Sequence, residues 1–211
     1  MKIIDVFTTY IHYLIHPFKT HEAFINPDRV EGFVPQRLSP YESLTTSWVF
    51  VILNGIFRIV TLNFVILLML DLISDTGFDY SSFLNIEEFP SLYFVVLSSV
   101  LDIIFYPLFG IFMIQFWEFI IKLFANLLNV SGDVSEKSQD IISVYFSSSI
   151  LKIIPIFGAP MQSLASMILM YAGLRKQLNA SPILSVCIIL TPLVIMLGLA
   201  SVIILLALLA L

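Results

Sequence analysis

The amino-acid sequence predicts an all-α integral membrane protein, a bundle of five transmembrane helices preceded by an amphipathic N-terminal helix. Of the 211 residues, 59% are hydrophobic and only 12% are charged, with a mean hydropathy of +0.99. Soluble globular domains are far less apolar than this. Several apolar runs reach the roughly 20 residues that a helix needs to cross a bilayer. Because lipid offers no hydrogen-bond partner to the backbone, such runs are expected to be helices.

Charge and cysteine content narrow the range of functions. The net charge is -5 at pH 7, whereas nucleic-acid binding requires clustered lysine and arginine. We therefore expect no nucleic-acid partner. The single cysteine, Cys187, lies within an apolar run, so it can form neither an internal disulfide nor a site of several thiolates.

Residues 1–47 are predicted to form a cytoplasmic segment that precedes a membrane domain of residues 48–211. Its first part, residues 1–16, has the pattern of an amphipathic helix, which Pro17 ends. Such a helix can lie in the membrane interface or pack on a neighbouring helix. The expected apolar face holds Ile3, Ile4, Phe7, Tyr10, Ile11, Leu14 and Ile15, and the polar face holds Asp5, Thr8, Thr9, His12 and His16.

The first span is predicted over residues 48–70, in a helix that begins ahead of the membrane. Ser39 and Glu42 have the spacing of a capping box, with Pro40 at the first helical position. Arg58 lies near the middle of this span, between Asn54 and Asn63. The loop that follows, residues 71–90, contains five acidic side chains and no lysine or arginine, as is typical of a non-cytoplasmic loop.

The second span is predicted over residues 91–128 as one long helix kinked at Pro107. Its second half carries polar residues in steps of three and four, which places them on one stripe of a continuous helix. The stripe holds Gln115, Glu118, Lys122, Asn126 and Asn129. The alternative is two spans joined by a turn at residues 106–110, but a tight apolar hairpin would leave backbone groups unpaired in lipid.

Three further spans are predicted over residues 141–157, 161–174 and 182–211. Asp133 and Glu136 offer a second capping box ahead of the third span. With five spans, the lysines and arginines near the span ends fall on one side of the membrane, which predicts a cytoplasmic N-terminus and an outside C-terminus. With six spans, the asymmetry of lysine and arginine between the two sides of the membrane would be weaker.

Three ionisable residues are predicted to lie at membrane depth. At 1.5 Å per residue, Arg58 and Asp102 each lie roughly 15 Å inside a span end, and Lys152 has a similar depth. Ionisable groups at this depth are functional candidates. The hypothesis is that Asp102 pairs with Arg58, with Lys152 nearby, inside the bundle. The simpler interpretation is that the cluster only sets helix register, or that Lys152 reaches outward to the membrane surface.

The remaining candidates carry weaker signals. His12 and His16 have the spacing of a two-histidine metal site, with His21 as a conceivable third ligand, but a solvated polar face explains them more simply. Glu118 and Lys122 are placed to form a local ion pair. The stripe of Gln115, Glu118, Lys122 and Asn126 is a candidate partner surface. No catalytic motif is found, so we expect no enzymatic activity and no cofactor or metal.

Several stretches of the chain resemble the Yip (Ypt/Rab-interacting protein) domain family of multi-span membrane proteins. They are LLNVSG at residues 127–132, VYFSSSILKIIPIFGAP at 144–160 and MYAGLRKQLNASPILSVCIILTP at 170–192. HPFKTHEAF and SPYESL also resemble the segments that precede the family's first span. The resemblance implies five spans, a cytoplasmic N-terminus and an outside C-terminus. Eukaryotic members contact prenylated small GTPases through a longer N-terminal region. The shorter segment here resembles bacterial or archaeal members, so a small GTPase is a partner by family analogy only.

Two functions are consistent with these patterns. The first is a non-enzymatic membrane scaffold or adaptor that binds other membrane proteins or a second copy of itself, or that acts in membrane organisation or trafficking. The alternative is a transporter or lipid-handling protein that uses Arg58, Asp102 and Lys152. The transporter hypothesis would gain from an internal repeat, and none is apparent in the sequence.

Overall fold

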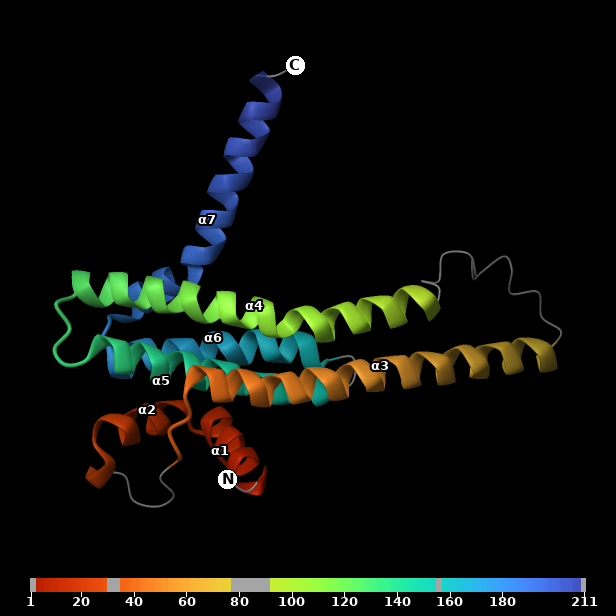
Figure 1. The fold of residues 1–211 in the computed structure, drawn as a ribbon, viewed down its shortest axis with the longest axis horizontal. Coiled ribbons are helices and arrows are strands. Elements are labelled where there is room, and N and C mark those ends of the chain that lie inside the picture. Colours follow the sequence, from red (N-terminus) through yellow and green to blue (C-terminus); the bar gives the residue numbers. More distant parts are fainter. Residues whose placement is uncertain (1–2, 30–34, 77–91, 155–156, 210–211) are drawn as a thin grey trace.

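The computed structural model describes residues 3–29, 35–76, 92–154 and 157–209, and within these ranges the chain is helical and contains no strand. Figure 1 shows two long helices side by side, a helical hairpin packed against them, a short N-terminal pair of helices on one flank and a C-terminal helix that stands away from the rest. The elements are α1 (Ile3–Ile15), α2 (Pro17–Ile25), η1 (Pro27–Arg29), α3 (Pro40–Thr76), α4 (Leu92–Leu127), α5 (Val134–Phe146), η4 (Ser147–Ile153), α6 (Gly158–Gln177) and α7 (Pro182–Leu209).

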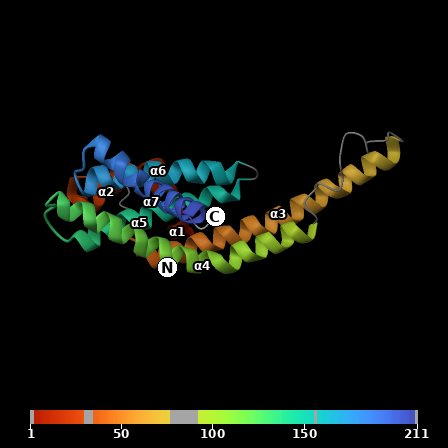
Figure 2. The same ribbon diagram turned by 90° about the horizontal axis from the view of Figure 1, so that it is seen from above.

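The long pair consists of α3 and α4, which run antiparallel in contact (Figures 1 and 2). The predicted capping box at the start of α3 is confirmed, because the Ser39 N–H donates to the Glu42 carboxylate at 2.8 Å and the Glu42 N–H donates to Ser39 Oγ at 3.3 Å. The helices approach closely at Gly55, where an added Cβ would lie 2.8 Å from Ile103 Cδ1. Small residues allow such close helix contacts in membranes.

The second predicted span is one continuous helix, α4, with Pro107 inside it, and the alternative turn at residues 106–110 is not formed. At the start of α3, Leu44 packs against Gly110 of α4. Since the helices are antiparallel, the part of α4 beyond about residue 115 extends past the start of α3 (Figure 1). The predicted polar stripe therefore lies on the protruding end of α4, except for Asn129, which follows the end of the helix at Leu127 and has a positive φ of 51°.

The third and fourth predicted spans form a hairpin of α5, η4 and α6. Only three helices in the described part of the chain are long and apolar enough to cross a membrane, with candidate spans Pro40–Thr61, Tyr93–Leu127 and Pro182–Leu208. The hairpin arms do not qualify because α5 and η4 are too short, at 13 and 7 residues, and α6, at 20 residues, is not apolar enough. The loop predicted over residues 71–90 begins later than expected, because α3 continues to Thr76, and residues 77–90 lie outside the described residues.

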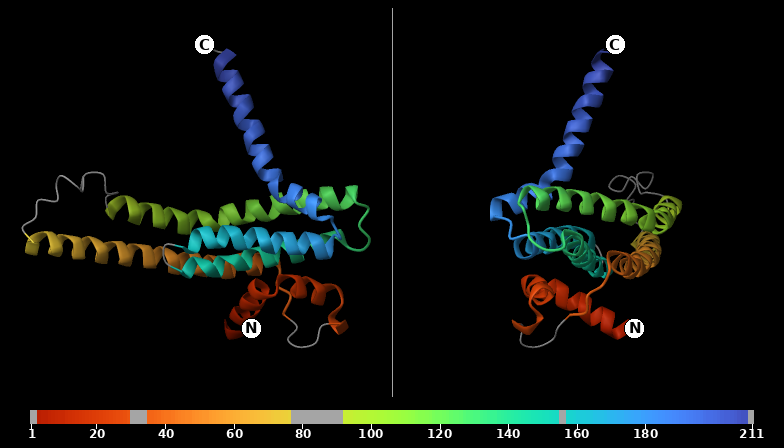
Figure 3. Two further views of the ribbon diagram at one scale, coloured as in Figure 1. Left: turned by 180° about the vertical axis from the view of Figure 1, so that it is seen from behind. Right: turned by 60° about the vertical axis from the view of Figure 1, so that its left-hand side comes forward.

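The largest core cluster forms where the protruding end of α4 meets α5, the end of α6 and the start of α7. Its fully buried members include Ile121, Ile141, Ile142, Leu174 and Ile188. After Ile188, α7 leaves the bundle, and the large side chains from Leu193 onward are exposed (Figure 3). In a bilayer those side chains would meet lipid.

The N-terminal segment is helical, but its apolar residues do not form one packed face. Tyr10 and Tyr13 are fully buried against the bundle, whereas Phe7, Ile11 and Ile15 are exposed. The helix pattern alone could not separate these two groups, because both are apolar and neighbouring on the helix surface. The packing of α1 against the bundle determined that the two tyrosines are buried and the other group is exposed.

Candidate functional site

The hairpin is joined to α3 by a line of buried hydroxyl groups, here called the serine seam, made of Ser43, Ser47, Ser143 and Ser149. Ser43 Oγ lies 2.8 Å from Ser143 Oγ, and Ser149 Oγ donates to Ser47 Oγ at 2.8 Å. Ser47 Oγ in turn donates to the Phe146 carbonyl at 2.9 Å. Buried hydroxyls are costly without partners, so these pairs fix the register of the hairpin against α3.

Helix α1 is bound to the same place. The Tyr10 hydroxyl donates to the Ser43 carbonyl at 2.6 Å, and its ring packs on Phe50 with centroids 5.9 Å apart. Burial raises the pKa of Tyr10 to about 12, so the phenol stays protonated and can donate. The serine seam is therefore closed by the N-terminal segment at the level where the apolar part of α3 begins.

A second polar group, the Arg37 cluster, ties α5 and α6 to the segment before α3. The Arg37 guanidinium contacts the Glu136 carboxylate and the Phe24 carbonyl, and Nη2 lies 3.6 Å from Asp140 Oδ2. Gln177 Nε2 donates to Asp140 Oδ2 at 3.2 Å. Burial raises the pKa of Asp140 to about 6, although the Arg37 charge opposes this shift.

The second predicted capping box is formed only in part. The Asp133 carboxylate caps α5 by accepting from the backbone N–H groups of Ser135 and Glu136. The Glu136 side chain binds Arg37 instead of returning to the cap. A full charge on Arg37 is a stronger partner for a carboxylate than a backbone N–H.

His21 lies buried between α2 and α6. Neither ring nitrogen has a hydrogen-bond partner in the described part of the chain, and an added Cβ on Gly173 would lie 3.0 Å from Nε2. Burial lowers the pKa of His21 to about 3, so the ring is neutral. His12 and His16 lie elsewhere, with ring centroids 5.4 Å apart and His12 Nδ1 3.3 Å from Thr20 Oγ1.

No metal site is assembled by these histidines. Among the residues that the structure describes, no three His, Cys, Asp or Glu side chains are grouped so that they could hold a metal ion. The His21 ring packs against the Phe24 ring in an edge contact. His12 lies on α1, and His16 lies between α1 and α2.

The structure brings Arg58 and Asp102 together, with Nη1 3.1 Å from Oδ2. However, their side chains are 44% and 64% exposed, so the pair lies on the outer surface of α3 and α4 and not inside the bundle. The reason is that the hairpin turns back before it covers this part of the two helices (Figure 1). Lys152 lies near the pair, since the Asp102 charge acts on it, and its Nζ lies over the Tyr106 ring, 4.8 Å from the centroid.

The polar stripe of α4 is on the surface. Gln115 and Asn126 are exposed, and Glu118 and Lys122 are partly buried. The predicted local ion pair is confirmed, with Lys122 Nζ 2.7 Å from Glu118 Oε1. The pair neutralises both charges within the helix and leaves the two amides available to a partner.

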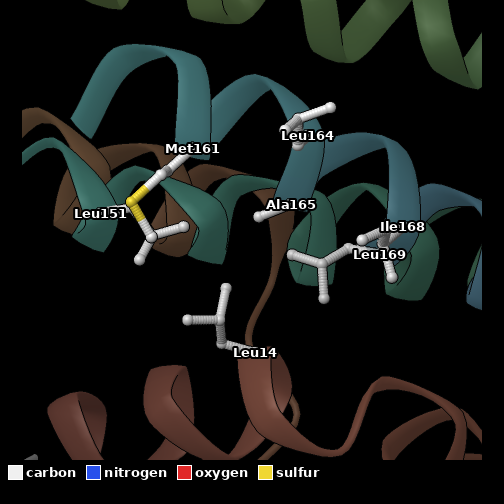
Figure 4. A pocket seen from close by; sticks show the side chains of 7 residues that line it. All are labelled: Leu14, Leu151, Met161, Leu164, Ala165, Ile168 and Leu169. Atoms are coloured by element: carbon white, nitrogen blue, oxygen red, sulfur yellow. The ribbon is translucent and has the colours of Figure 1, made fainter. Parts of the chain in front are cut away.

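An apolar groove of about 300 Å³ lies between α1 and the hairpin (Figure 4). It is lined by Leu14 of α1, Leu151 of η4 and a row of α6 residues from Met161 to Leu169. This volume is at the lower end of the range for small-molecule sites. Because the lining side chains are all apolar, the groove has no side-chain polar group with which to orient a polar ligand.

The residue patterns did not predict the Arg37 cluster, in which Asp140 and Gln177 lie beside Arg37. One signal was present: Glu136 and Asp140 lie at positions i and i+4, which places two carboxylates on one helix face and predicts a cation opposite them. The identity of that cation depends on the packing of a segment about 100 residues earlier in the chain.

Comparisons of the chain with protein-family models, with curated proteins and with solved structures give no match.

Proposed function

We propose that the protein is a non-enzymatic membrane scaffold or adaptor of the Yip type, which binds other membrane proteins or a second copy of itself. The observation that carries this proposal is that one end of the molecule is built as a fixed polar platform. There the Arg37 cluster holds the N-terminal segment on the hairpin, and α4 extends its polar stripe past the start of α3. A surface whose side chains are held by hydrogen bonds and ion pairs suits the binding of a partner.

The proposed topology follows from the hairpin. Its two arms begin and end on the same side as the N-terminal segment, since Arg37 contacts α5 and Glu22 pairs with Lys176 of α6 at 3.0 Å. The predicted third and fourth spans are then the two arms of a hairpin that enters the membrane and returns to the same side. Every other segment keeps the side of the membrane that the sequence predicts for it. We therefore keep five membrane-embedded segments, with a cytoplasmic N-terminus and an outside C-terminus.

Partner classes follow from the resemblance and from the platform. The Yip resemblance supports a small GTPase by analogy. By the same resemblance, a bacterial or archaeal cell membrane is the proposed location. The second partner class is another membrane protein. The amide groups of Gln115 and Asn126 can form hydrogen bonds with its polar surface beside the membrane. The lipid bilayer is the common partner in each case.

The test is site-specific photocrosslinking in native membranes. A photoreactive amino acid replaces Gln115 or Asn126 on the stripe, and in a control replaces Leu108, an exposed apolar position on the same helix. We expect discrete protein adducts, or a crosslinked dimer, from the two stripe positions and only lipid adducts from position 108. The proposal is wrong if the stripe positions yield no protein adduct while the fully folded variants are present at normal levels.

A second candidate, a transporter or lipid-handling protein, is favoured by the exposed Arg58–Asp102 pair and by the apolar groove. Charged pairs on an apolar surface are rare unless they serve a purpose. This candidate predicts solute or lipid movement across proteoliposomes that is lost in Asp102→Asn. Liposomes that stay sealed and inert with the wild-type protein would argue against it.

A further inference from the structure

We propose that α1 lies in the headgroup boundary of the surrounding phospholipid leaflet, with the groove between α1 and α6 occupied by a lipid acyl chain. This inference rests on the membrane embedding proposed above. It adds a lipid-binding surface that is separate from the polar stripe of α4. Four observations carry it.

The first observation is that α1 has three distinct sides. One side is buried on the bundle through Tyr10 and Tyr13. A second side is an apolar stripe of Phe7, Ile11 and Ile15, whose side chains are 44%, 36% and 61% exposed. Four-residue spacing places these three on one line along the helix. A stripe of large apolar side chains is costly in water but favourable in lipid.

The second observation is the level at which α1 sits. Tyr10 bonds to the Ser43 carbonyl and packs on Phe50, so α1 crosses α3 between these two residues. The apolar run of α3 begins at Trp48, and tryptophan is enriched at membrane–water interfaces. The contacts therefore hold α1 at the depth of the leaflet surface, where an interfacial helix belongs.

The third observation is the polar character of the remaining side. His12, His16 and Lys19 lie on the flank beside the apolar stripe, close enough that His16 and Lys19 act electrostatically on His12. Asp5 lies on the same flank at the start of α1. Lysine ammonium and imidazole N–H groups are donors that suit phosphate oxygens of lipid headgroups. The order of apolar stripe and then polar flank matches the order of acyl chains and then headgroups.

The fourth observation is that the groove continues this surface. Leu14 borders the stripe on α1 and forms one wall, while Leu164 and Ile168, exposed on α6, form the other (Figure 4). Ala165 between them gives the groove its depth. An apolar slot that opens sideways beside lipid-facing side chains accepts an acyl chain without displacing any polar contact.

The experiment places an environment-sensitive fluorophore on single cysteines in a Cys187→Ser background, in phospholipid nanodiscs. Ile15→Cys reports the stripe, Leu164→Cys the groove, and Asp5→Cys the polar flank. We expect blue-shifted emission and loss of fluorescence with chain-quencher lipids at positions 15 and 164. At position 5 we expect emission typical of water and loss of fluorescence with aqueous iodide.

A label at Ile204→Cys, exposed on α7, separates the two proposals. If lipid quenches position 204 but position 15 is open to iodide, α1 does not lie on the leaflet and this inference fails alone. Shielding of position 15 from both quenchers would mean that protein covers the stripe, which also overturns it. If position 204 is not quenched by lipid, the membrane embedding itself is wrong.

Discussion

The indole N–H of Trp48 on α3 donates to the backbone carbonyl of Ile103 on α4, at 2.8 Å. Pro107 lies four residues after Ile103 and has no N–H, so the regular helical donor for this carbonyl is missing. An unpaired carbonyl at this position would be costly in an apolar environment. The tryptophan of one long helix thus satisfies the backbone group that the proline of the other leaves open.

Trp48→Phe should lower the free energy of unfolding by about 1 kcal/mol through loss of this hydrogen bond. In a Pro107→Ala background the backbone N–H at position 107 can bond to Ile103, so the same Trp48→Phe change should cost much less. Reversible denaturation in detergent micelles measures all four proteins of this cycle. Equal costs in the two backgrounds would show that the indole does not compensate for the proline.

Asp102→Leu should destabilise the protein in bilayers by about 2 to 3 kcal/mol, because Arg58 would then face lipid without its counter-charge. Adding Arg58→Leu should restore most of the loss. The matched control is Lys122→Gln, which breaks the Glu118 pair on the protruding end of α4 and should cost only about 0.3 to 0.5 kcal/mol. The folded fraction in nanodiscs checks this, and failure of the double variant to recover would refute the pairing.

Gly173→Ala should destabilise the protein by about 1 to 3 kcal/mol, as expected for overpacking. The added Cβ would lie 2.8 Å from Ile141 Cγ1 and 3.0 Å from His21 Nε2, both held in the core. Gly198→Ala on α7 is the control, since nothing lies within 4 Å of that position. The control should gain about 0.5 to 1 kcal/mol from helix propensity. Thermal unfolding in one detergent compares the two variants, and similar effects would contradict the packing described for α2 and α6.

Stability should fall in mildly acidic solution because of His21. Its pKa is lowered to about 3 in the folded protein, so only the unfolded chain binds a proton as the pH falls below the ordinary value near 6.5. At pH 5 this difference amounts to about 2 kcal/mol of lost stability relative to pH 8. His21→Leu should lack this loss, as measured by unfolding midpoints from pH 8 to pH 5.

Asp140 should act in the opposite direction. Its pKa is raised to about 6, so its favourable contribution is present at low pH and is lost as the pH rises through 6. In the His21→Leu background the protein should therefore be more stable at pH 5 than at pH 7, and adding Asp140→Asn should flatten the profile. A pH profile unaffected by Asp140→Asn would mean that this carboxyl is not buried in solution.

Much of the local structure could be predicted from residue patterns. The capping box at Ser39, the continuous helix through Pro107 and the Glu118–Lys122 pair depend only on residues a few positions apart, and each is present. Apolar composition also predicted helices able to cross a membrane, and α3, α4 and α7 qualify. Such features follow from the helical repeat and from backbone pairing in lipid, which act within a segment.

The tertiary structure determined which side chains each helix face contacts. Arg37 binds Glu136 and Asp140 from about 100 residues away, Tyr10 and not Ile11 is buried, and the Arg58–Asp102 pair is left outside the bundle. The physical reason is the serine seam. Hydroxyl pairs between α3 and the hairpin fix where the hairpin packs along α3, and that position helps to decide which side chains are covered. Helical periodicity places side chains around one axis, but only the packing of several axes determines what each of them meets.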